Sequence, residues 1–174
     1  MCMFTNPLRN LKALGIRERD IVVDLGAGTG FYSIEAARIA DGGKVYAVEL
    51  NRDFLQTIRN KVKETKLGNI ECLWGDVEKI GGTKLGDSVA DKVIVSNVIF
   101  QVENKENFIE ETNRILKNGG QALVIDWSAD SPLSKKGLSV PKDAMKRMFE
   151  QKGFKFDREI DAGEHHYGMI FTKG

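Results

Sequence analysis

Three groups of residues in this sequence could bind or transform a small molecule: a glycine-rich loop, two acidic residues and a pair of histidines. The loop covers residues 24–30, at the end of an unbroken apolar run and before a helical pattern. Glycines at such a turn let the backbone bend tightly and approach a ligand, and the N–H groups that start the helix can face that ligand. A strand-to-helix turn without a ligand is the alternative, so the neighbouring motifs decide between the two.

Two acidic residues follow the next two β-type runs. Glu49 closes the second run, and Asp76 comes shortly after the third. A carboxylate at the end of a second strand can accept hydrogen bonds from both hydroxyls of a ribose, and one at a third strand end can accept an exocyclic N–H of a base. Alone, Glu49 could be a solvated residue that starts a helix, and Asp76 a turn-capping aspartate. Together with the glycine loop, the pair favours a nucleoside-bearing ligand.

The glycine spacing argues against a dinucleotide. Nicotinamide-dependent dehydrogenases use Gly-x-Gly-x-x-Gly, whereas here the third glycine is Gly30 and Phe31 occupies the dehydrogenase position. A pyrophosphate also needs an unobstructed helix N-terminus, and Phe31 and Tyr32 place two rings there. An uncharged nucleoside fits better, although a nicotinamide-dependent oxidoreductase, which shares this order of elements, stays open as an alternative.

The only histidines, His165 and His166, fall in a turn between the last two β-type runs. Adjacent strand residues point to opposite faces, so at most one of them looks into a site at that edge. With an ordinary pKa of about 6.5, an imidazole there could act as a general base at neutral pH. Trp127 and Tyr167 could line the same opening. The alternatives are an exposed turn histidine and ordinary packing of the two rings.

Periodicity and turn residues give the elements that must position these groups. Apolar and β-branched runs predict strands at residues 21–25, 44–50, 70–74, 92–96, 122–127, 155–160 and 167–172. Helical patterns lie at residues 7–14, 31–40, 54–67, 108–118 and 141–152. Strands that alternate with helices predict a mainly parallel sheet, and the last two strands predict an antiparallel hairpin.

Glycines mark two further features of this pattern. Between the third and fourth strands, Gly81, Gly82 and Gly86 weaken any helix, so a loop is expected there. Gly119 and Gly120 are expected to end the helix that precedes the fifth strand. In an open parallel sheet, ligands bind beyond the carboxyl ends of the strands, which is where the glycine loop and both acidic residues fall.

Length and charge limit the classes of function. With 174 residues and 41% hydrophobic composition, the chain is expected to be one domain. It would consist of a leading helix in residues 1–20, a cofactor-binding half in residues 21–127 and a substrate-side half with the terminal hairpin in residues 128–174. A net charge of +1 offers no broad field to attract nucleic acid or anionic lipid.

Cysteine usage and the N-terminal residues favour a soluble, cytoplasmic protein. Cys2 and Cys72 have neither metal-ligand spacing nor the pattern of a disulfide framework, so no metal is expected. The apolar stretch at the N-terminus contains Arg9 and Lys12, and it is too short and too interrupted for a signal peptide or a membrane span.

From residue 21 to residue 172, the chain resembles the class I S-adenosylmethionine (SAM)-dependent methyltransferases. Residues 23–30 are similar to the first motif of that family, residues 45–49 to its second-strand acidic motif and residues 74–77 to its adenine-contacting motif. Downstream, residues 87–97 resemble the fourth-strand segment of the small-molecule branch, and residues 114–120 its helix-to-strand turn. The resemblance implies a three-layer Rossmann-like α/β sandwich with a mostly parallel seven-stranded sheet and an antiparallel last strand.

The resemblance also implies roles for individual residues. SAM would be the cofactor, and its contacts would be Asp24 and Gly26 at the methionine portion, Ala27, Gly28 and Gly30 in the loop, Glu49 at the ribose, Leu50, Asp76 and Val77 at the adenine, and Ser96 beside the sulfonium. Gln101, Trp127 and Tyr167 are the candidates for substrate contact, and His165 and His166 for catalysis. The implied reaction is methyl transfer to a small molecule.

Departures from the family narrow the acceptor. The branches that methylate nucleobase amino groups carry an Asn/Asp-Pro-Pro-aromatic signature after strand four, whereas this chain has residues Ser96 to Ile99 without a proline. The segment 96–102 looks most like quinone-type and arsenite-type methyltransferases, but the cysteines that arsenite enzymes use are missing. Neither the acceptor nor the oligomeric state follows from the sequence.

Substrate recognition is expected to come from loops, because little chain precedes the first strand. Residues 128–140, which include Lys135 and Lys136, could form a flap over the substrate, and Phe4 and Thr5 could close over the methionine end. A solvated connection is the alternative for the first of these segments. Without a clear lid or base, a non-catalytic SAM-binding or partner-binding module also stays open.

Overall fold

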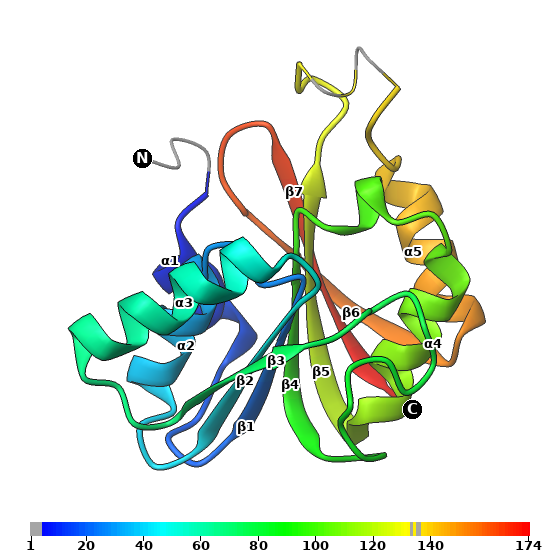
Figure 1. The fold of residues 1–174 in the computed structure, drawn as a ribbon. Coiled ribbons are helices and arrows are strands. Elements are labelled where there is room, and N and C mark those ends of the chain that lie inside the picture. The colour runs from blue at the N-terminus through cyan, green and yellow to red at the C-terminus, as the bar shows by residue number, and fades with distance from the viewer. Residues whose placement is uncertain (1–4, 133, 135–136) are drawn as a thin grey trace.

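A mostly parallel sheet forms the centre of the computed structural model, which describes residues 5–132, 134 and 137–174 (Figure 1). The strand order is β3-β2-β1-β4-β5-β7-β6. The strands are β1 (Ile21–Leu25), β2 (Lys44–Glu49), β3 (Ile70–Trp74), β4 (Ala90–Ser96), β5 (Leu116–Trp127), β6 (Phe154–Ile160) and β7 (His166–Lys173). All neighbouring strands run parallel except β7, which lies antiparallel to both β5 and β6. The expected fold class is confirmed.

Helices cover both faces of this sheet and complete three layers (Figure 1). One face carries α1 (Pro7–Leu14), α2 (Phe31–Ile39) and α3 (Arg52–Thr65), and the other carries α4 (Lys105–Ile115) and α5 (Lys142–Gln151). Side chains at the N-caps start several of them: Asn6 accepts from the backbone N–H of Arg9, and Asn104 from that of Asn107. None of the described helices is long and apolar enough to cross a membrane.

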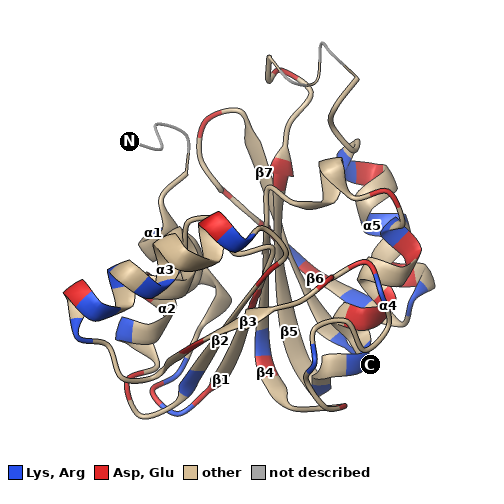
Figure 2. Ribbon diagram, in the orientation of Figure 1, with Lys and Arg blue, Asp and Glu red and all other residues tan. Residues whose placement is uncertain are grey.

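Burial on both faces explains the apolar runs of the central strands. Along β1, Val23 and Leu25 pack toward α4 and α5, whereas Val22 packs toward α1 and α2. A parallel strand with helices on each side therefore reads as a continuous hydrophobic run. On the outer surfaces, Lys and Arg are interspersed with Asp and Glu along α3, α4 and α5, so none of these three helices presents a face of one sign (Figure 2).

Strand β5 begins earlier than the sequence pattern predicts. Helix α4 ends at Ile115, and Leu116 already has extended backbone angles and pairs with Ala90. The pairing shifts register between Ala90 and Lys92. Gly119, at φ 77°, and Gly120, where a Cβ would lie 2.8 Å from a backbone oxygen, belong to this irregular part of the strand. The prediction that these glycines end a helix is wrong, because an irregular strand also requires residues without a Cβ.

The segment between β3 and β4 forms turns, as expected, and Glu111 of α4 holds it in place. The buried carboxylate of Glu111 accepts from Gly81 N and from Thr83 Oγ1, and it pairs with Arg114. Burial alone would raise the pKa of Glu111, but the hydrogen bonds from Arg114 and Thr83 hold it down at about 2. The ionised carboxylate of Glu111 thus holds this segment of turns in position beside the site.

Candidate functional site

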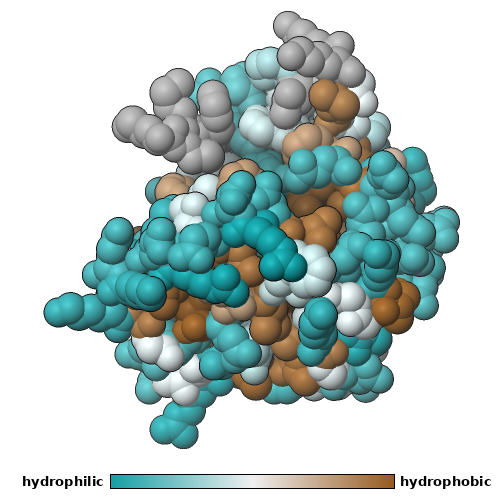
Figure 3. Space-filling view, viewed as in Figure 1, coloured by the Kyte–Doolittle hydropathy of each residue, from teal (hydrophilic) through white to brown (hydrophobic). Residues whose placement is uncertain are grey.

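The carboxyl ends of β1, β2, β3 and β4 meet in one cavity of about 1110 Å³. Its size suits a ligand larger than a simple metabolite, because small-molecule sites usually span about 300 to 1,000 Å³. The predicted residues that line it are Asp24, Gly26, Ala27, Gly28, Glu49, Leu50, Asp76, Val77, Ser96 and Gln101. Apolar surface lies in the recess between the two helical layers (Figure 3).

The glycine loop is fixed to the neighbouring strand and leaves its backbone open to the cavity. The N–H groups of Gly26 and Ala27 both bind the carbonyl oxygen of Val48, at 3.0 and 3.1 Å. A Cβ on Gly26 would lie 2.6 Å from the side chain of Val98, so only glycine fits there. A Cβ on Gly28 would meet nothing within 4 Å, which leaves room for a ligand against the loop.

Gly30, also a predicted cofactor contact, lies behind this cavity instead of on its wall. It caps α2 at φ 79°, and a Cβ there would lie 3.0 Å from Ile58. It lines an adjoining hollow of about 460 Å³ that shares Phe31 and Lys61 with the main cavity. The structure therefore gives Gly30 a packing role in addition to its place in the loop.

The carboxylate of Glu49 is held rigidly at the end of β2. Its Oε2 accepts from Gly28 N and its Oε1 from Asn51 N, both at 2.8 Å, and the residue is 9% exposed. A carboxylate offers about four acceptor positions, so two backbone donors leave capacity for two more. Glu49 can therefore bind a pair of adjacent hydroxyls without rearrangement.

At the end of β3, Asp76 both caps a turn and lines the cavity. Its carboxylate accepts from Glu78 N at 3.1 Å and pairs with Lys79 at 3.0 Å, and the hydrogen bond from Lys79 lowers the pKa of Asp76. Val77 follows it on the same wall, and Leu50, which is 53% exposed, lines the cavity at the end of β2. Both interpretations of Asp76, turn cap and ligand contact, are compatible with this geometry.

Asp24 brings a second buried carboxylate to the cavity. It is 3% exposed, and its Oδ2 accepts from the hydroxyl of Ser33 at 2.6 Å. Burial raises the pKa of Asp24 to about 7, with a further contribution from the nearby charge of Glu49. A positively charged ligand group beside Asp24 would favour its ionised form.

Tyr32 and Thr5 close the same end of the cavity. The Tyr32 hydroxyl accepts from the side-chain nitrogen of Asn10 at 2.9 Å, and it also exchanges hydrogen bonds with Ser96 and Thr5. Burial raises the pKa of Tyr32, so the hydroxyl is neutral at physiological pH. Thr5 thus lines the cavity, its closing over the methionine end of a cofactor stays a prediction, and Phe4 lies outside the described residues.

Several cavity residues were not expected from the sequence. They are Phe54 and Lys61 of α3, Asn51, Glu78 and Asn97. Asn97 has a positive φ of 55°, and its side-chain Oδ1 is buried without a hydrogen-bond partner in the described part of the chain. An asparagine directly after a strand is a signal that could have been read, since asparagine tolerates the left-handed region better than most residues.

The structure does not bring the predicted histidines, Trp127 or Tyr167 to this cavity. His165 Nδ1 lies 3.0 Å from Asp130, in the turn between β6 and β7. His166 packs on the ring of Trp127, with centroids 4.2 Å apart. The Tyr167 hydroxyl donates to a backbone carbonyl at 2.8 Å. These residues lie on β5, β7 and the adjoining turn, next to the cavity along the sheet edge.

The segment 128–140 leaves β5 beside this edge. The N–H of Ser128 binds the carbonyl oxygen of His165 at 2.9 Å, which ties the start of the segment to the β6–β7 turn. Lys135 and Lys136, on which the expected flap partly rests, lie outside the described residues.

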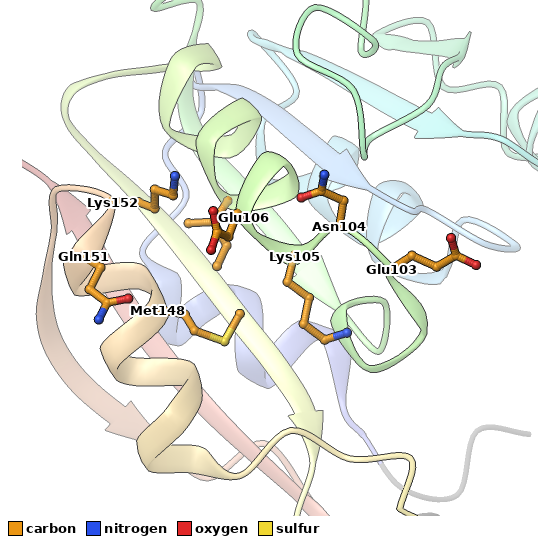
Figure 4. A pocket seen from close by; sticks show the side chains of 8 residues that line it. Glu103, Asn104, Lys105, Glu106, Met148, Gln151 and Lys152 are labelled. Carbon is orange, nitrogen blue, oxygen red and sulfur yellow. The ribbon is translucent and has the colours of Figure 1, made fainter.

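A separate hollow of about 820 Å³ lies between α4 and α5 (Figure 4). Its walls mix acidic, basic and apolar side chains, and Lys152 there already pairs with Glu110. It contains none of the predicted site residues. Among the residues that the structure describes, no group of three or more His, Cys, Asp or Glu side chains could hold a metal ion.

Comparison with known proteins shows which family this chain belongs to. A family model described as "Methyltransferase domain" matches residues 16–170. The ubiquinone/menaquinone biosynthesis C-methyltransferase UbiE of Haemophilus ducreyi is 30% identical over 116 residues, which cover 66% of this chain and 44% of that protein. UbiE of Escherichia fergusonii is 30% identical over 125 residues, or 70% of this chain and 49% of that protein. The chain thus spans less than half the length of these curated relatives.

Solved structures share the fold. A SAM-dependent methyltransferase from Aquifex aeolicus superposes with a TM-score of 0.89 at 23% identity, over 99% of this chain and 92% of the other. The cyclase SpnF superposes with a TM-score of 0.80 at 13% identity, over 95% and 80% of the two chains. Since the second protein is named a cyclase, the fold alone does not define the reaction.

Proposed function

The chain belongs to the methyltransferase-domain family, and from this premise we propose that it transfers the methyl group of SAM to a small-molecule acceptor. The observation that carries the proposal is the row of groups around one cavity: the open glycine loop after β1, the fixed carboxylate of Glu49 after β2 and Asp76 after β3. These three groups match the three parts of an adenosine-bearing ligand, from its amino-acid end through its ribose to its base.

The charges of the cavity support SAM over a phosphate-bearing nucleotide. Its described lining contains four carboxylates, those of Asp24, Glu49, Asp76 and Glu78, against one basic residue, Lys61. The ammonium of Lys61 already donates to the carbonyl oxygen of Thr29 at 2.8 Å. A sulfonium cation fits such an acidic cavity, and the pyrophosphate of a nicotinamide dinucleotide does not.

When bound, SAM supplies an electrophilic methyl group on its sulfonium. Glu49 would hold the ribose hydroxyls with its two remaining acceptor positions, and Asp76 and Val77 would bind the adenine at the end of β3. Asp24 faces the cationic end, beside Ser96. Most of the acceleration comes from holding two reactants in line, which is worth up to about 7 to 11 kcal/mol when the geometry is good.

The acceptor would approach from the side of the cavity formed by the residues that follow β4. There the wall consists of uncharged side chains, those of Asn97, Val98, Gln101 and Val102. Such a wall favours a neutral or aromatic acceptor over a charged one. The curated relatives are named as ubiquinone/menaquinone biosynthesis C-methyltransferases, and this agrees with a ring-type acceptor for this chain. Two cysteines without the pattern of a disulfide framework support the proposal of a cytoplasmic location.

Of the two histidines, His166 has the tautomer that a general base requires, and it lies beside the cavity and not on its wall. Its Nδ1 lies 2.8 Å from a backbone carbonyl oxygen, so Nδ1 carries the hydrogen and Nε2 keeps a lone pair, which has no partner in the described structure. Burial lowers the pKa of His166, which keeps the ring neutral at pH 7. If His166 acts as a base, H166Q lowers the methylation rate constant more than H165Q does, and equal rates for the two variants would rule the role out.

A binding experiment tests the proposed function. SAM and S-adenosylhomocysteine are expected to raise the melting temperature of the wild type, and E49A is expected to lose most of that shift. E71A is the matched control, because Glu71 lies on the outer strand β3 and does not line the cavity. No shift with either ligand would contradict the proposal. Release of a labelled methyl group to an acceptor panel separates an enzyme from a SAM-binding module.

A further inference from the structure

The backbone at the end of β4 is held in an unusual conformation at Asn97. Its φ of 55° lies in the left-handed region, and its N–H donates to the carbonyl oxygen of Ile125 at 2.9 Å. The described residues other than glycine with a positive φ are Lys66, Lys84, Ser88, Asn97 and His165. Of these, Asn97 lines the cavity and the other four do not. Strained backbone of this kind is concentrated at functional sites.

The side chain of Asn97 adds an unmet hydrogen-bonding demand. Its Oδ1 is buried and has no donor among the residues described. Most buried polar atoms in proteins have a partner. An unpartnered acceptor oxygen on a residue that lines the cavity indicates that a donor arrives with a ligand.

The side chains around Asn97 indicate which kind of molecule would carry that donor. Val98 and Val102 supply apolar surface, and Gln101 a second amide. The four carboxylates of the cavity come from other segments: Asp24 from β1, Glu49 from β2, and Asp76 and Glu78 from the turns after β3. Residues 97–102 therefore lie beyond Ser96, the β4 residue assigned to the cofactor, on the side from which the acceptor would approach.

We propose that Asn97 is a specificity-determining residue, whose side-chain oxygen accepts a hydrogen bond from a hydroxyl or amino group of the acceptor. This rests on the proposed function, because it assigns the acceptor side of the same site. Asn97 combines the two properties the position requires: it tolerates a positive φ, and it carries a short acceptor. Glycine would keep the backbone conformation and remove the acceptor, so it is the informative substitution.

The first experiment measures stability without any ligand. N97G is expected to melt at or above the temperature of the wild type, because it relieves the backbone strain and removes an unpartnered buried oxygen. N97A should melt below N97G, since alanine cannot relieve the strain. S88G is the control, as Ser88 has a φ of 54° in an exposed turn outside the cavity. A melting temperature of N97G well below both S88G and the wild type would show that the amide holds the fold together, and it would overturn the proposal.

The second experiment measures recognition in protein saturated with S-adenosylhomocysteine. The probes are 1,4-dihydroxynaphthalene, kept reduced under argon, and its dimethyl ether, titrated by calorimetry. Loss of one hydrogen bond to a ligand predicts that N97G binds the dihydroxy compound about tenfold more weakly than the wild type. The dimethyl ether should bind both proteins equally.

The outcomes separate this proposal from the proposed function. Equal affinity of wild type and N97G for the dihydroxy compound, or no binding of it by the wild type, would overturn the role of Asn97. Wild type and N97G should bind S-adenosylhomocysteine with the same affinity, because Asn97 is not among the residues assigned to the cofactor. If the wild type fails to bind S-adenosylhomocysteine itself, the proposed function fails and not the specificity assignment alone.

Discussion

Replacing Asp24 with asparagine tests the electrostatics of the cavity, because the substitution changes charge with little change in shape. The asparagine side chain is nearly isosteric with aspartate, and its oxygen could still accept from the Ser33 hydroxyl, which lies 2.6 Å from Asp24 Oδ2. The ligand-free protein is expected to become more stable, while cofactor binding becomes weaker.

The magnitude follows from the pKa of Asp24. Burial raises that pKa from 3.8 to about 7, so the folded state binds this proton more tightly than the unfolded state. The stability that protonated Asp24 provides is therefore lost as the pH rises from 3.8 to 7. At pH 8 the ionised carboxylate costs the fold up to about 4 kcal/mol, at about 1.4 kcal/mol per pKa unit.

D24N removes this penalty and replaces it with the smaller cost of burying an amide. We expect D24N to be about 2 to 4 kcal/mol more stable than the wild type at pH 8, and less than about 1 kcal/mol more stable at pH 4. Urea unfolding of both proteins at the two pH values measures the difference. D41N is the control, since Asp41 is an exposed aspartate in the turn after α2.

Cofactor binding should change in the opposite direction. Without the carboxylate, SAM loses a charge-assisted interaction, and its affinity is expected to fall about 10- to 100-fold in calorimetry. D41N should match the wild type in both assays. If D24N were less stable than the wild type at pH 8, or bound SAM equally well, the assignment of Asp24 as an uncompensated buried carboxylate would be refuted.

Three further predictions follow from the same geometry. The affinity of the wild type for SAM should fall as the pH drops below 7, approaching about tenfold per pH unit, because Asp24 must release its proton first; an affinity that calorimetry finds constant from pH 5 to 8 would contradict this. G26A should destabilise the fold, since its Cβ would lie 2.6 Å from Val98 Cγ2, whereas G28A, whose Cβ meets nothing within 4 Å, should lose less stability but still weaken SAM binding; equal unfolding midpoints for the two would argue against the packing role of Gly26. E111Q should cost about 3 kcal/mol at pH 7, a contribution that is present above pH 4.5 in the wild type and lost as the pH falls toward 2; urea unfolding at pH 7 and pH 3 checks it, and an unchanged difference between the two pH values would refute it.

The fold could be predicted closely because the patterns of its strands and of its helices are both strong in the sequence. Continuous apolar runs such as Ile21–Leu25 are typical of strands buried on two faces, and the alternation with helices predicts parallel pairing. The start of β5 could not be read in this way. Leu116 extends because it pairs with Ala90 across the sheet, and a pairing between distant residues leaves no local signal.

The site could be predicted in part, for the same physical reason. Glu49 is the last residue of β2 and Asp76 comes shortly after the end of β3, so both must lie at the carboxyl edge of the sheet, and their place in the cavity follows from the strand assignment. Which way a side chain points beyond that edge depends on tertiary contacts. The ring of His166 packs against that of Trp127, and the Tyr167 hydroxyl donates to a backbone carbonyl oxygen. Neither contact is visible in the local sequence pattern.

Crystals grown with S-adenosylhomocysteine give the most direct measurement of the central claim. We expect the ligand to lie across the ends of β1, β2 and β3, with its ribose hydroxyls on the carboxylate of Glu49 and its adenine beside Asp76 and Val77. A cavity that stays empty at saturating ligand, or that holds a phosphate-bearing nucleotide in preference to it, would contradict the account.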